Sequence, residues 1–151
     1  MYGDSAKAVR KNLLTIRWLP ETANRKLKVT KVNRVHKALQ AVSDDLALLD
    51  RGALKIAGQT SGPFNWRKIK GTDRLSSHSF AIALDVGVKS SDYWRWNKPG
   101  PDGRYPYRNR IPLDIVKVFE KHGFIWGGKW YHFDTMHFEY RPELLDKRCG
   151  R

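Results

Sequence analysis

Apolar residues recur at helical spacing in two stretches of the chain. The first stretch begins after Asn33 and ends before Gly52, and its apolar positions fall three or four residues apart: Val35, Leu39, Val42, Leu46 and Leu49. Such a stripe covers one face of a helix, and Asn and Gly favour the two ends. In the second stretch Pro112 and Gly123 enclose Ile115, Val116 and Phe119. Proline suits a first helical turn, so the pattern predicts two amphipathic helices.

Other segments alternate between apolar and polar positions or are continuously apolar and β-branched. A short helix is expected before residue 15, after the capping residues Asp4 and Ser5. Strands are predicted at 15–19, 27–30, 55–57, 80–88, 124–126 and 130–133. The last two flank Gly127 and Gly128, which favours a hairpin. The sequence therefore predicts an α+β fold over residues 1–151, one domain with a mainly antiparallel sheet packed against two or three helices.

Length and composition fit a globular protein that can bury a core. The chain has 151 residues, of which 40% are hydrophobic, and no apolar run reaches the roughly 18 residues of a membrane span. Met1 is not followed by a basic and then apolar segment. We therefore expect either a protein that stays inside the cell or a mature form whose leader was removed.

Net charge limits the classes of binding partner, and cysteine content limits the kinds of metal site. The net charge is +14, from 29 basic and 15 acidic residues, which favours a polyanionic partner such as nucleic acid, a membrane surface or an acidic cell-wall polymer. Cys149 is the single cysteine. It excludes an intramolecular disulfide and a cysteine-rich zinc site, so any metal must be held by histidine and carboxylate.

Two segments place ionisable residues among apolar ones. In the downstream segment four such residues fall within eight positions: His132, Asp134, His137 and Glu139. The upstream segment supplies His78 and Asp85. Burying these groups costs free energy unless something pairs with them, and a bound metal would do so. The alternative without a metal is a set of structural histidines, with Asp85 capping a turn before Gly87 and the aromatic residues filling the core.

Strand alternation only partly brings these groups together. It places Ala81, Ala83 and Asp85 on one face, where small residues leave room beside the carboxylate. His132 and Asp134 share a face by the same rule, but His137 has the opposite parity. A turn or bulge at positions 135 and 136 is therefore required to bring both to one site.

The chemistry of the six residues suits a catalytic zinc. His78, Asp85 and His137 would give zinc three protein ligands and leave the fourth position open, as in catalytic sites. Zinc lowers the pKa of bound water to about 7. Asp134 would then accept a proton from that water, and His132 would steady the oxyanion or assist proton transfer. Glu139 would orient a ligand imidazole.

Two separated motifs add a resemblance to a known family. They are Ser76-x-His78-x6-Asp85 and, downstream, Trp126-Gly-Gly-x-Trp followed by His132-x-Asp-x-x-His-Phe-Glu. Their order resembles the zinc D-alanyl-D-alanine carboxypeptidase and L-alanyl-D-glutamate endopeptidase family of cell-wall peptidases. This family includes phage endolysins and shares its core with the lysostaphin-like enzymes and the hedgehog signalling domain. The resemblance runs from about residue 64 to residue 145.

The resemblance implies roles for individual residues. It gives the zinc ligands as His78, Asp85 and His137, the base as Asp134 and an auxiliary histidine as His132. It also implies an upstream arginine that faces the substrate or its oxyanion, with Arg67 the better candidate and Arg74 the weaker. One departure is Ala81, where members usually have glycine; its methyl is expected to narrow the pocket without removing the metal.

The predicted function is a monomeric zinc peptidase that hydrolyses stem peptides of peptidoglycan, as a carboxypeptidase or an endopeptidase, and also contacts anionic cell-wall polymers. It would work in the periplasm or cell wall after loss of a leader, or be a cytoplasmic phage endolysin. The alternative is a non-catalytic polyanion-binding module, in which the aromatic and basic residues of 93–110 stack bases and contact phosphate. Those residues otherwise form an aromatic loop over the sheet or the rim of a cleft. A third interpretation keeps the zinc without catalysis, against which the retained Asp134 argues.

Overall fold

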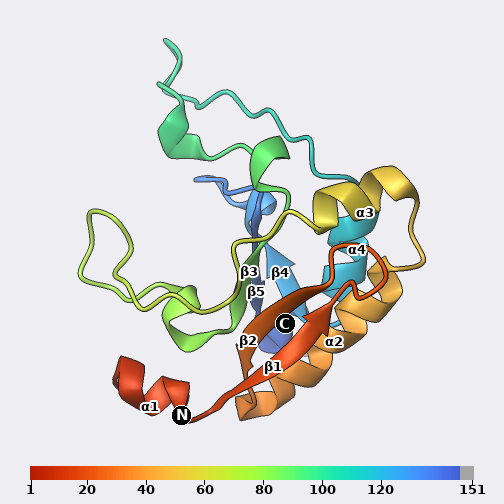
Figure 1. Cartoon of the computed structure of the whole chain (residues 1–151). Coiled ribbons are helices and arrows are strands. Elements are labelled where there is room, and N and C mark those ends of the chain that lie inside the picture. Colours follow the sequence, from red (N-terminus) through yellow and green to blue (C-terminus); the bar gives the residue numbers. More distant parts are fainter. Residues whose placement is uncertain (147–151) are drawn as a thin grey trace.

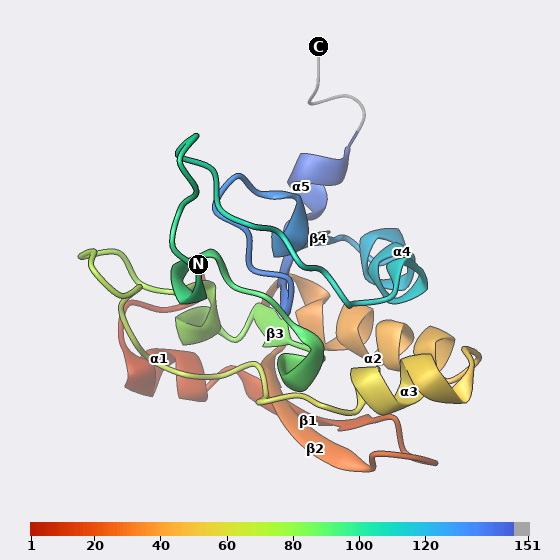
Figure 2. The ribbon, with the colours of Figure 1, turned by 90° about the horizontal axis from the view of Figure 1, so that it is seen from above.

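The computed structural model describes residues 1–146 and shows the predicted α+β fold (Figures 1 and 2). Its helices in this range are α1 (Ala6–Arg10), α2 (Val35–Leu46), α3 (Arg51–Ala57), α4 (Leu113–Lys121) and α5 (Pro142–Leu145). Its strands are β1 (Leu13–Trp18), β2 (Arg25–Thr30), β3 (Ala83–Asp85), β4 (Phe124–Trp126) and β5 (His137–Tyr140). None of the helices in residues 1–146 is long and apolar enough to cross a membrane. Cys149 lies outside the described residues.

Strands β1 and β2 form an antiparallel hairpin whose inner face is apolar. Ile16 lies opposite Leu27, and both side chains are buried. Helix α2 lies against this hairpin and against α4 (Figure 1). The far end of the hairpin is fixed by hydrogen bonds: the Trp18 indole Nε1 donates to the Ala57 carbonyl (3.0 Å), and the Leu19 amide donates to Ser43 Oγ (2.8 Å).

The second sheet has the strand order β3-β5-β4, and both pairs are antiparallel. Asp85 on β3 lies directly opposite His137 on β5. Directly paired residues of antiparallel strands project to the same face. The register of this small sheet therefore sets two of the predicted site residues side by side.

A continuous apolar core joins the two sheets through the helices. Phe119 on α4 is fully buried and stacks on Phe138 of β5, with ring centroids 4.0 Å apart. It also contacts the rings of Phe124 and Trp18, at 5.5 and 6.1 Å. The interpretation of the whole chain as one domain stays a prediction.

Phe119→Ala is expected to lower the free energy of unfolding by about 3–5 kcal/mol, because it removes a ring from the centre of this core and leaves a cavity. Denaturant titration would measure the change. The matched control is Leu113→Ala in the same helix, whose side chain is 60% exposed and whose loss should stay within about 0.5 kcal/mol. Equal effects of the two substitutions would contradict this description of the core.

Three predictions about the first half were wrong. Helix α2 ends at Leu46, and residues 55–57 belong to helix α3, not to a strand. The Asp50 carboxylate explains the break, because its Oδ1 accepts the amides of Gly52 and Ala53 and so starts a new helix. Asn33 does not cap α2: it has a φ of 51°, and Arg34 holds the N-cap position.

The predicted strand at 80–88 is also shorter than expected. Only β3 is extended, and the residues before it form a 3₁₀ turn, Ser77–Phe80. Ala81 follows this turn with a φ of 54° and is fully buried. Alanine is strained in this left-handed region, whereas glycine is not. The methyl group of Ala81 therefore strains the backbone at this buried position. That it narrows the pocket stays a prediction.

The predicted hairpin across Gly127 and Gly128 does not form. The two glycines begin a 3₁₀ turn, residues 130–133 form no strand, and β4 pairs with β5. A Cβ at Gly128 would lie 2.2 Å from the indole of Trp126, and one at Gly127 would lie 2.7 Å from the Asp134 carbonyl oxygen. The glycines thus permit close approach of the chain to Trp126 and to Asp134.

Candidate metal centre

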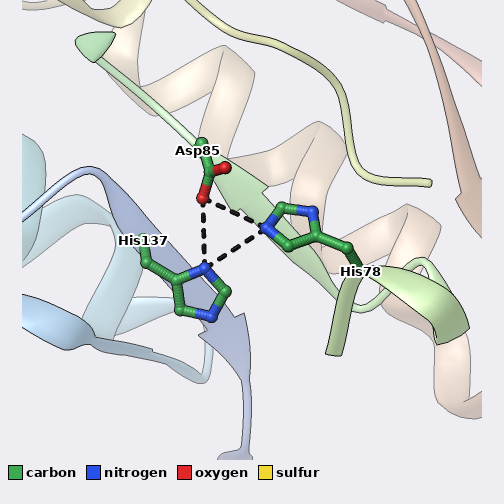
Figure 3. Close-up of side chains that lie close together, drawn as sticks. All are labelled: His78, Asp85 and His137. Atoms are coloured by element: carbon green, nitrogen blue, oxygen red, sulfur yellow. Dashed lines mark hydrogen bonds and ion pairs between the residues drawn. The ribbon is translucent and has the colours of Figure 1, made fainter. Parts of the chain in front are cut away.

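Three of the predicted residues converge on one point (Figure 3). Asp85 Oδ1 lies 3.1 Å from His78 Nε2 and 3.1 Å from His137 Nδ1, and the two nitrogens are 3.3 Å apart. Ligands held about 2.0–2.1 Å from zinc at tetrahedral angles are about 3.3 Å from one another. The spacing and the donor types therefore fit a zinc ion. They leave one tetrahedral position without a ligand from this triad.

His78 is positioned by the turn that carries it. The Ser76 hydroxyl accepts the His78 amide at the start of the turn (3.3 Å), and the ring is buried. Its Nδ1 lies 3.2 Å from the Pro63 carbonyl oxygen. Since a carbonyl only accepts, Nδ1 carries the proton and donates, which leaves the Nε2 lone pair directed at the triad.

His137 is held with its nitrogens reversed relative to those of His78. Its Nδ1 faces the triad, while Nε2 donates to Glu139 Oε2 at 3.2 Å. The Ser77 hydroxyl oxygen also lies 3.2 Å from Nε2, and Arg141 donates to the other oxygen of Glu139 at 3.1 Å. A carboxylate that holds the remote nitrogen of a ligand histidine orients the ring and raises its basicity.

The charge balance of the triad favours a cation. Burial raises the pKa of Asp85, but the close His137 and His78 rings outweigh burial and hold that pKa well below its ordinary value. Burial lowers the pKa of His137, yet its hydrogen bonds to Asp85 and Glu139 more than offset this and raise the pKa to about 10. A site that attracts protons so strongly also attracts a metal ion, which competes with them for the same lone pairs.

Asp134 lies next to the triad. The predicted turn at Thr135 and Met136 is present and is closed by the His137 amide, which donates to the Asp134 carbonyl (3.2 Å). Burial raises the pKa of Asp134 to about 6; the charge of His137 opposes that rise and the charge of Asp85 adds to it. One carboxylate oxygen, Oδ1, is buried without a hydrogen-bond partner among residues 1–146. A buried acceptor that lacks a donor is costly, so this oxygen is available to a group bound in the site.

A cleft of about 920 Å³ lies beside the triad, and His137 is the triad residue that lines it. Asp134, Glu139, Arg67, Arg74 and His132 also line this cleft. The backbone of Arg67 is tied to Ser79, whose hydroxyl accepts the Arg67 amide (3.0 Å) and donates to the Arg67 carbonyl (2.9 Å). The side chains of both arginines are exposed. The structure thus brings both predicted arginines to the cleft and does not choose between them.

His132 and the segment 93–110 meet at the edge of the cleft. The His132 ring is exposed and lies against Trp94, with centroids 4.1 Å apart. Trp94 lines the cleft together with its neighbours Tyr93 and Arg95. Of the interpretations of this segment, the rim of a cleft is therefore the one that these positions support.

Sequence reasoning missed several supporting residues. Ser77 lay inside the first motif but carried no pattern that distinguished it from its neighbours. Arg141 and the Pro63 carbonyl act through contacts between distant segments, and one of the two groups is backbone. Glu139 was found because it shares strand parity with His137.

One comparison with known proteins gives a match, and it falls on the same part of the chain. Residues 70–140 match the family model of D-alanyl-D-alanine carboxypeptidase, within the 64–145 predicted from the motifs. No match to the chain was found among curated proteins or among solved structures. The matched region carries the converging triad and Asp134. Over residues 70–140, the chain is therefore similar to the D-alanyl-D-alanine carboxypeptidase family.

Proposed function

We propose that the protein is a zinc-dependent peptidase that hydrolyses peptide bonds in the stem peptides of bacterial peptidoglycan. The observation that carries this proposal is the convergence of His78, Asp85 and His137 beside the unpartnered carboxylate oxygen of Asp134. This arrangement lies in the region that matches a peptidase family. The cleft above it is large enough for several residues of a peptide.

Zinc held by His78, Asp85 and His137 would polarise the substrate carbonyl and make a bound water more acidic. Asp134 accepts the proton of the attacking water and passes it to the leaving amine. Its raised pKa suits both steps, because an acid–base catalyst works best when its pKa lies near the working pH. Glu139 and Arg141 keep His137 in one tautomer throughout, so that Nδ1 stays a lone-pair donor.

The cleft walls supply donors for the carbonyl oxygen that gains negative charge. His132 lines the cleft on one side, and Arg67 and Arg74 line it from the loop before His78. Preorganised donors at such an oxygen stabilise the transition state. We assign this role to Arg67 and His132, with Arg74 as the alternative arginine.

The remaining assignments belong to the same proposal. The whole chain acts as one monomeric domain, in the periplasm or cell wall, or as a phage endolysin made in the cytoplasm. The charge of +14 attracts the carboxylates and phosphates of cell-wall polymers. A non-catalytic polyanion-binding module has less support, because the aromatic and basic segment lies at the rim of the candidate metal centre.

Chelation and reconstitution test the proposal. Zinc-loaded protein should release soluble fragments from purified peptidoglycan, a chelator should stop the release, and added zinc should restore it. Release that continues after complete removal of metal would contradict a zinc peptidase. Salt-sensitive binding without any release would favour the polyanion-binding module.

Arg67→Ala should lower kcat/KM about ten- to one-hundred-fold, the range expected for a lost charge-assisted hydrogen bond. The melting temperature should hardly change, because the side chain is exposed and forms no ion pair with another described residue. Steady-state kinetics and calorimetry would measure the two effects.

Arg74→Ala is the matched control for this prediction, since both arginines line the same cleft. A larger kinetic loss in Arg74→Ala would transfer the substrate-binding role to Arg74. A fall of several degrees in melting temperature with activity kept would make Arg67 a structural residue.

A further inference from the structure

The exposed aromatic side chains of residues 1–146 gather in two segments, 93–110 and 127–133. Those that are largest and most exposed are Tyr131 (74%), Trp96 (60%), Tyr107 (49%) and Trp130 (38%). The segments lie side by side in both views of the ribbon (Figures 1 and 2). Tyr93 forms a bridge with Asp134, and the Trp94 amide donates to the Phe133 carbonyl (3.0 Å). We call the surface formed by Trp94, Trp96, Trp130, Tyr131 and His132 the aromatic rim.

A buried carboxylate fixes the longer of the two segments. Asp92 Oδ1 accepts the side-chain amide of Asn97, and Oδ2 accepts the backbone amide of Arg108, both at 2.9 Å. The backbone of Asp92 pairs with Thr135, whose hydroxyl accepts the Asp92 amide (2.6 Å) and whose amide donates to the Asp92 carbonyl (2.9 Å). The Arg108 amide thus closes the loop on Asp92, and Asp92 is itself bonded to Thr135 beside Asp134, so the rim keeps a defined position relative to the triad.

The rim begins at the triad and extends away from it. The Trp130 ring lies 5.6 Å from the His137 ring. Trp94 and His132 line the cleft beside it, and Arg95 lies over the Trp94 ring at 4.9 Å. Trp96 and Tyr131 lie further out, since neither lines the cleft. Aromatic side chains left in water on a soluble protein indicate a binding surface.

We propose that the aromatic rim is a subsite for the glycan strand to which the stem peptides are attached. The C–H faces of a pyranose ring stack on exposed aromatic rings, and its hydroxyl and N-acetyl groups accept hydrogen bonds from neighbouring side chains such as Arg95. This inference rests on the proposed function, since the glycan is the part of peptidoglycan that accompanies every stem peptide.

The position of the rim has a consequence for the bond that is cut. An extended peptide spans about 3.3–3.6 Å per residue, and Trp130 is next to His137. A sugar ring stacked on Trp130, the rim residue next to His137, would therefore leave room for only the first one or two residues of the stem before the triad. The structure favours hydrolysis close to the sugar over hydrolysis at the far end of the stem.

Binding can be measured without catalysis. Peptide-free glycan strands, titrated into the zinc-free protein in a calorimeter, should bind saturably. The double variant Trp96→Ala/Tyr131→Ala should bind at least about ten-fold more weakly, while Leu48→Ala, which removes an equally exposed side chain far from the rim, should bind like the wild type. No binding, or binding that the double variant keeps, would overturn the proposal. Tighter binding of a single-stranded oligonucleotide would assign the rim to nucleobases instead.

A kinetic comparison provides a second test of the glycan subsite. The ratio of kcat/KM for glycan-linked stem peptides to that for free stem peptides should be well above one in the wild type and should fall about ten-fold in the double variant. An unchanged ratio, or hydrolysis confined to the last bond of the stem, would count against the subsite. If neither substrate is hydrolysed, the proposed function fails, and the calorimetric titration still decides whether the rim binds glycan.

Discussion

Asp134→Asn is expected to lower kcat by at least about two orders of magnitude while the protein folds and keeps its zinc. General-base catalysis contributes about 10²- to 10⁴-fold, or roughly 3–5 kcal/mol of the barrier. Asparagine preserves the shape of the side chain and removes the proton acceptor. The acidic limb of the pH–rate profile, which we assign to this carboxylate or to a zinc-bound water, should change in the variant.

The same substitution should stabilise the zinc-free protein near neutral pH. The pKa of Asp134 is raised to about 6 in the folded chain, so the folded state binds this proton more tightly than the unfolded state. The stability linked to that proton is complete below the unfolded pKa near 4 and is lost as the pH rises through about 6. Thermal unfolding should therefore show a gain for Asp134→Asn at pH 7 of up to about 3 kcal/mol and little gain at pH 4.

Two outcomes would contradict the role given to Asp134. Loss of zinc in Asp134→Asn would make this residue a ligand. Near-normal turnover with zinc in place would give the proton transfer to His132 or Glu139.

His137→Ala is expected to abolish both zinc binding and hydrolysis. The substitution removes one of the three proposed ligands and leaves the half-buried Asp85 carboxylate beside a single histidine. Elemental analysis of the purified protein should find about one zinc per wild-type chain and almost none in the variant.

The control for this prediction is His122→Ala. His122 also lies next to a carboxylate, that of Asp45, at 2.8 Å, but it takes no part in the triad. This variant should keep its zinc and its activity. Full zinc occupancy in His137→Ala would rule out the ligand assignment.

The sequence predicted the helices with long apolar stripes and the three residues, His78, Asp85 and His137, that the structure brings together. The stripe from Val35 to Leu46 and the one around Phe119 became α2 and α4, because burial of one face decides such segments. The turn between Asp134 and His137 was inferred because a shared site required both residues despite their opposite strand parity, and the structure confirms the turn.

The errors arose where a few local contacts outweighed the pattern. The Asp50 cap starts a helix in a segment that reads as loop and strand. The glycines after Trp126 resemble a hairpin turn, but they serve close approach to its indole and to the Asp134 carbonyl. The supports of the triad, such as the Pro63 carbonyl and Arg141, depend on tertiary contacts that no spacing in the sequence records.

Mass spectrometry of muropeptides tests the central claim most directly. Purified peptidoglycan is digested in parallel with zinc-loaded wild type and with zinc-loaded Asp134→Asn. The glycan is then cut to disaccharides, and the masses of the resulting muropeptides are measured. We expect the wild type to remove a defined part of the stem peptide, whose mass names the bond, and the variant to leave nearly all stems intact. Unchanged muropeptide masses after treatment with the zinc-loaded wild type would contradict the account.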